Sequence, residues 1–151
     1  IVNLLKIILL VYDSILMDTV SKEVRSRNMS AIRSKNTNPE TVVRSLLFAL
    51  GYRYRLHKKD LPGKPDIILK KHNTVIFVHG CFWHQHKECK RANIPKSNKK
   101  YWIPKLERNV ERDKINKREL NRLGWNVITI WECETKDSGK ITAELKKKLN
   151  G

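Results

Sequence analysis

The sequence predicts an α/β domain in which helices flank a mixed central β-sheet. Helical and strand patterns follow one another in the order αβββαβα along the 151-residue chain, with no internal repeat and no linker. Two of the strand patterns, 66–71 and 73–78, are separated only by a short polar turn and therefore predict a hairpin. Helices interspersed among strands in this way are typical of one layered domain built around one core.

A weaker helical pattern precedes this order, which itself opens with a helix and a strand. Residues 21–32 are basic with a thin apolar stripe, and are interpreted as a helix packed on the domain or as an arm that reaches a partner. A firmer helix is predicted over 39–50, because apolar side chains recur on one face, Asn38 can cap its start and Gly51 follows its end. The alternating segment 52–57 predicts the first strand.

The pattern after the predicted hairpin contains two more helices and one strand. Residues 90–101 are basic and predict a loop. After Pro104 a helical pattern runs to about Leu123, where a glycine is expected to end it. Residues 125–132 predict the last strand, and 138–149 predict a short amphipathic helix that closes the domain.

The chain carries a large excess of positive charge. Lysine and arginine outnumber aspartate and glutamate by 32 to 15, which gives a formal net charge of +17. An excess of this size favours a polyanionic partner, with nucleic acid ahead of an anionic membrane surface. A merely soluble basic surface is the alternative. If several phosphates are contacted, binding should weaken by orders of magnitude between low and physiological salt.

The first sixteen residues form an apolar stretch of different character. They include Lys6 and Asp13, and they fall short of the roughly 20 residues that a membrane-spanning helix needs. They also lack the basic leader and the small-residue cleavage site of a secretory signal. We expect translation to begin at Met17, so that residues 1–16 are a non-native or disordered extension and residues 17–151 form the domain.

Every cysteine of the chain falls into one candidate metal site. Cys81 and Cys89 flank His86, and Cys133 lies at the end of the predicted last strand. Three cysteines are too few, and odd in number, for a disulfide framework, which indicates a reducing compartment. Thiolate and imidazole ligands in this pattern suit tetrahedral Zn²⁺, and four protein ligands would make the site structural. Buried, inert cysteines are the alternative.

A second group combines a carboxylate with two histidines. Asp66 opens one strand of the predicted hairpin, His79 ends the other, and His84 follows shortly after. Aspartate oxygens suit Mg²⁺, while histidine can activate water or protonate a leaving oxygen. In a strongly basic protein the obvious substrate is a phosphodiester, whose transition-state charge a metal stabilises. The alternative is that Asp66 is a turn residue and that both histidines are only satisfied polar groups.

Aromatic residues lie next to the same segment. Phe82 and Trp83 follow Gly80, and Trp102 lies beside a run rich in lysine. Apolar side chains next to positive charge can wedge between base pairs and unstack them. Core packing is the alternative for any one of the three.

Several long motifs occur together in this chain. They are SRNMSAIRSKNTNPE at 26–40, PGKPD at 62–66, FVHGCFWHQH at 77–86, NVERD at 109–113 and LGWNVITIWEC at 123–133. In this order they resemble the very-short-patch-repair (Vsr) DNA mismatch endonucleases. The resemblance implies a restriction-endonuclease-like core of the PD-(D/E)-x-K type. It also implies an enzyme that nicks one strand 5′ to the thymine of a T:G mispair, the product of 5-methylcytosine deamination.

The resemblance implies roles for the residues of the second group and for two others. Asp66 would bind the catalytic Mg²⁺ together with the backbone carbonyl of Val78, which stands where the family has a threonine. His84 would activate the attacking water. His79 and Glu40 would hold the hydrated Mg²⁺ and the phosphate, which for Glu40 goes beyond the simpler interpretation of a carboxylate favoured by a helix dipole.

Further roles implied by the resemblance concern zinc and DNA. The structural zinc ligands would be Cys81, His86, Cys89 and Cys133. The aromatic wedges beside the mismatch would be Phe82, Trp83 and Trp102, and Met29 would lie in the N-terminal region that clasps the DNA.

The implied partners are double-stranded DNA with a T:G mismatch and, further, mismatch-repair proteins, in the cytoplasm of a bacterium and without a membrane. We expect a monomer, because an asymmetric lesion gives no reason for a two-fold partner. Two alternatives stay open. One is a restriction-type nuclease on the same core, and the other is a non-catalytic, zinc-stabilised DNA-binding module. Such a module would have no use for Asp66, His79 and His84 together.

Overall fold

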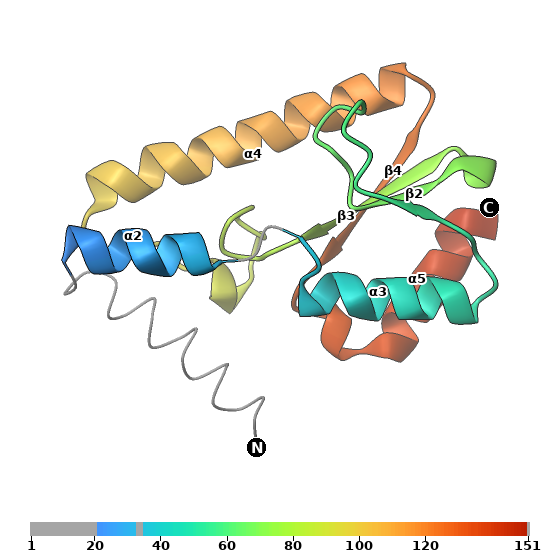
Figure 1. Cartoon of the computed structure of the whole chain (residues 1–151), viewed down its shortest axis with the longest axis horizontal. Coiled ribbons are helices and arrows are strands. Elements are labelled where there is room, and N and C mark those ends of the chain that lie inside the picture. Colours follow the sequence, from blue (N-terminus) through green and yellow to red (C-terminus); the bar gives the residue numbers. More distant parts are fainter. Residues whose placement is uncertain (1–20, 33–34, 151) are drawn as a thin grey trace.

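A four-stranded sheet with helices on both faces organises the computed structural model, which describes residues 21–32 and 35–150 (Figure 1). The strands are β1 (Arg55–Leu56), β2 (Ile67–Leu69), β3 (Thr74–His79) and β4 (Asn126–Trp131), in that spatial order. The first three pair antiparallel, whereas β4 pairs parallel with β3. The predicted mixed sheet flanked by helices is therefore confirmed. The predicted extension, residues 1–16, and the expected start at Met17 lie outside the described residues.

Two helices, α3 (Asn38–Ala49) and α5 (Ser138–Asn150), lie on one face of the sheet (Figure 1). The two helices pack together in one apolar cluster, in which Val43 and Leu47 of α3 and Leu145 of α5 are fully buried. The strand residues in the same apolar cluster alternate along their strands, as side chains on one face must. They are Ile67, Leu69, Ile76, Ile128 and Ile130.

One long helix, α4 (Lys99–Arg122), crosses the opposite face (Figure 1). Its Leu120 is buried in a smaller cluster with Ile68 of β2 and with Val75 and Phe77 of β3. Burial on both faces explains why β2 and β3 read as almost continuous apolar runs in the sequence. In the described parts of the chain, no helix has both the length and the hydropathy to cross a membrane.

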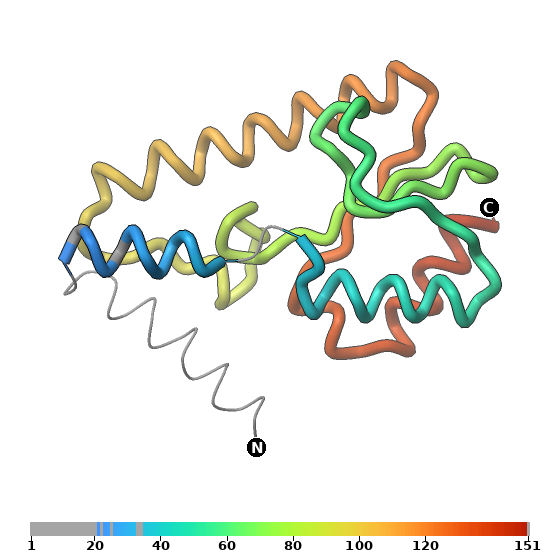
Figure 2. The backbone as a smooth tube through the Cα atoms, viewed as in Figure 1, coloured from blue at the N-terminus to red at the C-terminus, as the bar shows by residue number. Residues whose placement is uncertain are grey.

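The chain between the sheet and α4 is a long loop, residues 80–98, interrupted by a short 3₁₀ turn, η2 (Lys90–Ala92). Figure 2 traces this loop from the end of β3 to the start of α4. A separate helix, α2 (Lys22–Ala31), precedes the sheet and is capped by Ser21, whose side chain accepts a hydrogen bond from Val24 N at 3.4 Å. The predicted helix over 21–32 is thus present.

Three predicted boundaries were wrong. Thr37, and not Asn38, caps α3, because its Oγ1 accepts from Glu40 N at 3.4 Å while its backbone is extended. Of the strand predicted over residues 52–57, only the two exposed residues of β1 are strand in the structure. Helix α4 starts at Lys99 and continues through Pro104. Burial of apolar side chains on both sides of this proline offsets the backbone hydrogen bond that it removes.

Candidate active site and metal centre

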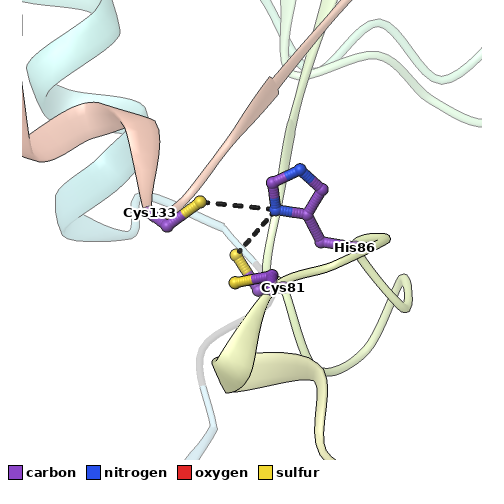
Figure 3. Close-up of side chains that lie close together, drawn as sticks. Cys81, His86 and Cys133 are labelled. Atoms are coloured by element: carbon purple, nitrogen blue, oxygen red, sulfur yellow. Dashed lines mark hydrogen bonds between the residues drawn. The ribbon is translucent and has the colours of Figure 1, made fainter.

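The three cysteines and His86 come together at one end of the sheet. The Nδ1 atom of His86 lies 3.3 Å from Sγ of Cys133 and 3.7 Å from Sγ of Cys81 (Figure 3). With Cys89 included, all four donor atoms lie within 4.8 Å of one another. Zinc bonds of about 2.3 Å to sulfur and 2.0 Å to nitrogen place tetrahedral donors roughly 3.5–3.8 Å apart. The arrangement of these side chains therefore fits Zn²⁺.

Strand register explains how ligands so distant in sequence meet. The parallel pairing of β3 with β4 places His79 beside Trp131. Cys81 and Cys133 each follow two residues later, so both leave the sheet at the same end. His86 is oriented by Trp131, on whose ring it stacks at 4.2 Å between centroids with 6° between planes.

Two of the three thiols, Cys81 and Cys133, need a cation to become thiolates at physiological pH. Burial raises the pKa of the Cys81 thiol to about 12, and burial also raises the pKa of Cys133. Without metal these groups are therefore neutral at physiological pH. A coordinated divalent ion reverses this preference, because its charge stabilises the thiolate directly.

Asp66 stands just before β2 with its side chain only 17% exposed. Its Oδ2 accepts a hydrogen bond from Val78 N, across the β2–β3 pair, at 2.8 Å. Burial raises the pKa of Asp66 to about 6; the Val78 N–H opposes this shift, and the nearby Glu40 carboxylate adds to it. The carboxylate is therefore a poorly solvated group that a cation would stabilise.

Glu40 is nearly inaccessible, with 2% of the residue exposed. It accepts hydrogen bonds from Asn36 N at 3.0 Å, from Thr37 Oγ1 at 3.3 Å and from Arg44 Nη2 at 2.7 Å. The reciprocal bonds with Thr37 amount to a capping arrangement at the start of α3. The same carboxylate forms a group with His57 and Asp66 whose donor atoms lie within 4.8 Å of one another. Glu40 thus links the start of α3 to the Asp66 carboxylate.

A second cluster joins both predicted histidines to a residue that sequence reasoning missed. The rings of His79 and His84 stack at 3.8 Å between centroids, with 6° between their planes. His84 Nδ1 lies 2.5 Å from Oδ2 of Asp113 in α4. Burial, with a smaller contribution from His84, lowers the pKa of His79 to about 4, so this imidazole is neutral at physiological pH.

Both clusters line one cleft of about 1080 Å³. Its walls include Asp66, Val78, His84 and Asp113, so the structure brings the predicted catalytic residues into one space. Met29 and Trp83, predicted to contact DNA, line the same cleft. Basic side chains surround these groups, namely Lys35, Lys59, Lys64, Lys105 and Arg112.

The other predicted aromatic wedges lie differently. Trp102 is 1% exposed, and its ring packs 5.5 Å from that of Phe82 and 6.1 Å from that of Trp83. Trp102 is therefore buried against the rings of Phe82 and Trp83, and it could touch a base only if its ring moved away from them. Its predicted DNA contact, like that of Phe82, stays a prediction.

Comparison with known proteins identifies the family. Residues 17–91 match the family model described as DNA mismatch endonuclease Vsr. The chain is 39% identical over 127 residues to the DNA mismatch endonuclease Vsr of Escherichia coli (strain K12), an alignment covering 84% of this chain and 81% of that protein. The chain belongs to the Vsr DNA mismatch endonuclease family. It is accordingly a DNA endonuclease, an enzyme that hydrolyses phosphodiester bonds.

Other Vsr-family relatives are described as type II nicking enzymes. V.XorIIP of Xanthomonas oryzae pv. oryzae is 49% identical over 133 residues, with 88% of this chain and 97% of that protein covered. V.NmeAIP of Neisseria meningitidis serogroup A is 48% identical over 120 residues, with 80% and 85% covered. Among solved structures, the catalytic domain of the homing endonuclease I-Bth0305I matches with a TM-score of 0.53 and 25% identity, covering 74% of this chain and 93% of that domain.

Loss of one zinc ligand should destabilise this Vsr-family domain as a whole. Zinc-binding free energy is folding free energy, so Cys133→Ala should lower the free energy of unfolding by several kcal/mol. Denaturant titration with and without a zinc chelator measures this. The chelator should destabilise the unmodified protein and have little further effect on the variant. A variant that keeps one tightly bound zinc and full stability would contradict the assignment.

Asp66 should reduce stability at neutral and alkaline pH in the absence of Mg²⁺. The pKa of Asp66 is about 6 in the folded protein and 3.8 ordinarily, so the folded state binds the Asp66 proton more tightly than the unfolded state does. The free energy of unfolding therefore falls as the pH rises through 6. Asp66→Asn should therefore raise the free energy of unfolding at pH 8 by about 1–3 kcal/mol, and by much less near pH 4.

Denaturant titrations of the zinc-loaded protein at both pH values measure this difference. Asp60→Asn is the matched control, because the Asp60 side chain is 65% exposed and should leave stability almost unchanged. A lower stability of Asp66→Asn at pH 8 would show that ionised Asp66 holds the fold together.

Proposed function

We propose that this chain nicks one strand of duplex DNA 5′ to the thymine of a T:G mispair, by Mg²⁺-dependent hydrolysis that leaves 5′-phosphate and 3′-hydroxyl ends. The observation that carries this proposal is the meeting of two chemistries in one cleft. Asp66 offers a carboxylate for a metal, and the His84–Asp113 pair offers proton transfer a short distance away. Membership of the Vsr family supports the T:G substrate.

Asp113 determines what His84 can do. A carboxylate only accepts, so the 2.5 Å contact places the His84 proton on Nδ1 and leaves the Nε2 lone pair free. An imidazole held in this tautomer can take a proton from water that attacks the phosphate. Asp113 is thus a positioning residue for His84. The stacked, neutral His79 restricts the plane of the His84 ring.

The donor set at Asp66 fits Mg²⁺, which binds through one or two carboxylates and keeps several water ligands. Asp66 and the Val78 backbone would hold the ion, while the buried Glu40 and the neutral His79 would hydrogen-bond its water ligands. When bound, Mg²⁺ supplies positive charge against the negative charge that develops on the attacked phosphate. The chain itself orients the carboxylate through Val78 N.

The surface of the cleft suits a nucleic acid. Lys105 lies 5.4 Å from the centroid of the Trp83 ring, so positive charge and an aromatic face occur together inside the cleft. Such a pair can engage a phosphate and a displaced base at once. Met29 of α2 also lines the cleft, which supports the proposal that this helix contacts the DNA. We further propose that Phe82 and Trp102 support this wedge.

Two further parts of the proposal concern partners. The enzyme would act as a monomer in the bacterial cytoplasm, and mismatch-repair proteins would meet its nicked product. A restriction-type nuclease on the same core would cut fully paired DNA. A non-catalytic DNA-binding module would not need Asp66, His84 and Asp113 in one cleft.

A nicking assay separates these three possibilities. A duplex with one T:G mispair should be nicked in the thymine strand when Mg²⁺ is present, while its fully paired T:A control stays intact. The zinc-loaded Asp66→Ala variant should lose at least 1000-fold in nicking rate, on the order expected for removal of a metal ligand, yet bind the mismatched duplex normally. End-labelled strands on a sequencing gel measure rate and position.

Equal cutting of both duplexes would contradict mismatch specificity and favour the restriction-type nuclease. Binding without cutting across varied flanking sequences would favour the binding module. Loss of folding in Asp66→Ala, seen as a lower melting temperature, would assign Asp66 a structural role.

A further inference from the structure

His57 lies directly across from Asp66. The β1–β2 pairing matches Leu56 with Ile67, and it continues by one residue through a hydrogen bond from His57 N to Asp66 O at 3.2 Å. The ring turns to the same side, with Nδ1 4.0 Å from Asp66 Oδ1. His57 is therefore the cross-strand neighbour of the carboxylate that would bind the metal.

Arg44 determines where the proton of His57 lies. Its Nη2 lies 2.7 Å from Glu40 Oε2 and 3.0 Å from His57 Nε2, and its Nη1 is anchored on Asn36 Oδ1 at 2.9 Å. A guanidinium only donates, so His57 Nε2 must accept and the ring proton must sit on Nδ1. That proton faces Asp66.

The backbone of His57 adds a further observation. Its φ of +48° lies in the left-handed region, which residues other than glycine adopt uncommonly, although histidine does so more often than most. Such a conformation persists where the surrounding structure holds it. Here the residue that adopts it has its Nδ1 4.0 Å from Asp66 Oδ1.

We propose that His57 is a positioning residue that directs its Nδ1–H at Asp66 Oδ1 and so fixes how this carboxylate faces the metal. Val78 N already holds Oδ2 at 2.8 Å, so the two donors would clamp the carboxylate from both sides. The 4.0 Å separation exceeds a hydrogen bond, so the two atoms must approach by about 1 Å for this bond to form. This inference rests on the proposed function, in which Asp66 binds the catalytic cation.

A direct metal ligand role fits His57 less well. The Nε2 lone pair faces Arg44, whose positive charge would repel a second cation between Glu40 and His57. The remaining nitrogen carries the proton in the tautomer that Arg44 imposes. The geometry therefore favours donation to Asp66 over coordination.

Because His57 has a left-handed backbone conformation, substitutions that tolerate this conformation isolate the role of the side chain. His57→Gly keeps this conformation and removes the donor, whereas His57→Asn keeps the conformation and offers an amide N–H near the place of Nδ1. Asn73→Gly is the control, because Asn73 has a φ of +46° at the β2–β3 turn and no contact with the cleft. Mn²⁺ serves as the probe, titrated into the zinc-loaded, DNA-free protein and followed by electron paramagnetic resonance.

We expect His57→Gly to weaken Mn²⁺ binding about 10-fold or more, and His57→Asn to stay within about 3-fold of the unmodified protein. Asn73→Gly should bind as the unmodified protein does. Nicking of the T:G duplex should follow the same order, with equal melting temperatures. Unchanged Mn²⁺ affinity in His57→Gly, or equal losses in both His57 variants, would overturn the inference. Asp66→Ala belongs in the same titration: if it keeps full affinity, the metal site of the proposed function fails together with the inference.

Discussion

The pairing of β3 with β2 on one side and with β4 on the other fixes both sites at once. On the β2 side it brings Asp66 to Val78 N, which holds the carboxylate. On the β4 side it aligns His79 with Trp131, so that Cys81 and Cys133 leave the sheet together. A slip of one residue would turn His79 to the opposite face. Burial of β3 on both faces opposes this slip, because its alternate residues fill two separate apolar clusters.

Burial acts on the two titratable groups of the cleft in opposite ways. It raises the pKa of Asp66 to about 6, so this carboxylate is ionised at neutral pH only at a cost in stability. It lowers the pKa of His79 to about 4, so this imidazole is neutral there. A divalent ion would stabilise the ionised Asp66 and recover part of that cost as binding energy. Glu40 is treated differently, because Arg44 and the start of α3 satisfy its charge inside the protein. Asp66 is thus available for a cation, whereas Glu40 is already held by the protein in the place from which it would hydrogen-bond the water ligands of the cation.

Sequence reasoning predicted the architecture and that Asp66 and His79 lie near each other, because a hairpin brings the start of one strand to the end of the next; both line the same cleft. It also grouped the four zinc-site residues, since they include every cysteine. It missed Asp113 and His57. Asp113 contacts His84 across a loop whose path no sequence pattern reveals. The importance of His57 depends on a left-handed backbone and on a tautomer imposed by Arg44. For Trp102 the sequence left core packing open beside a wedge into DNA, and the structure buries it at the start of α4.

The central claim is that His84 and Asp113 act as one unit on a phosphate held beside Asp66. A double-mutant cycle under single-turnover conditions measures this, with His84→Ala, Asp113→Ala and both together on a T:G duplex. The account predicts that each single variant is slow and that the double variant is scarcely slower than His84→Ala, because Asp113 works only through His84. Losses that multiply in the double variant, or an Asp113→Ala enzyme as fast as the unmodified protein, would contradict it.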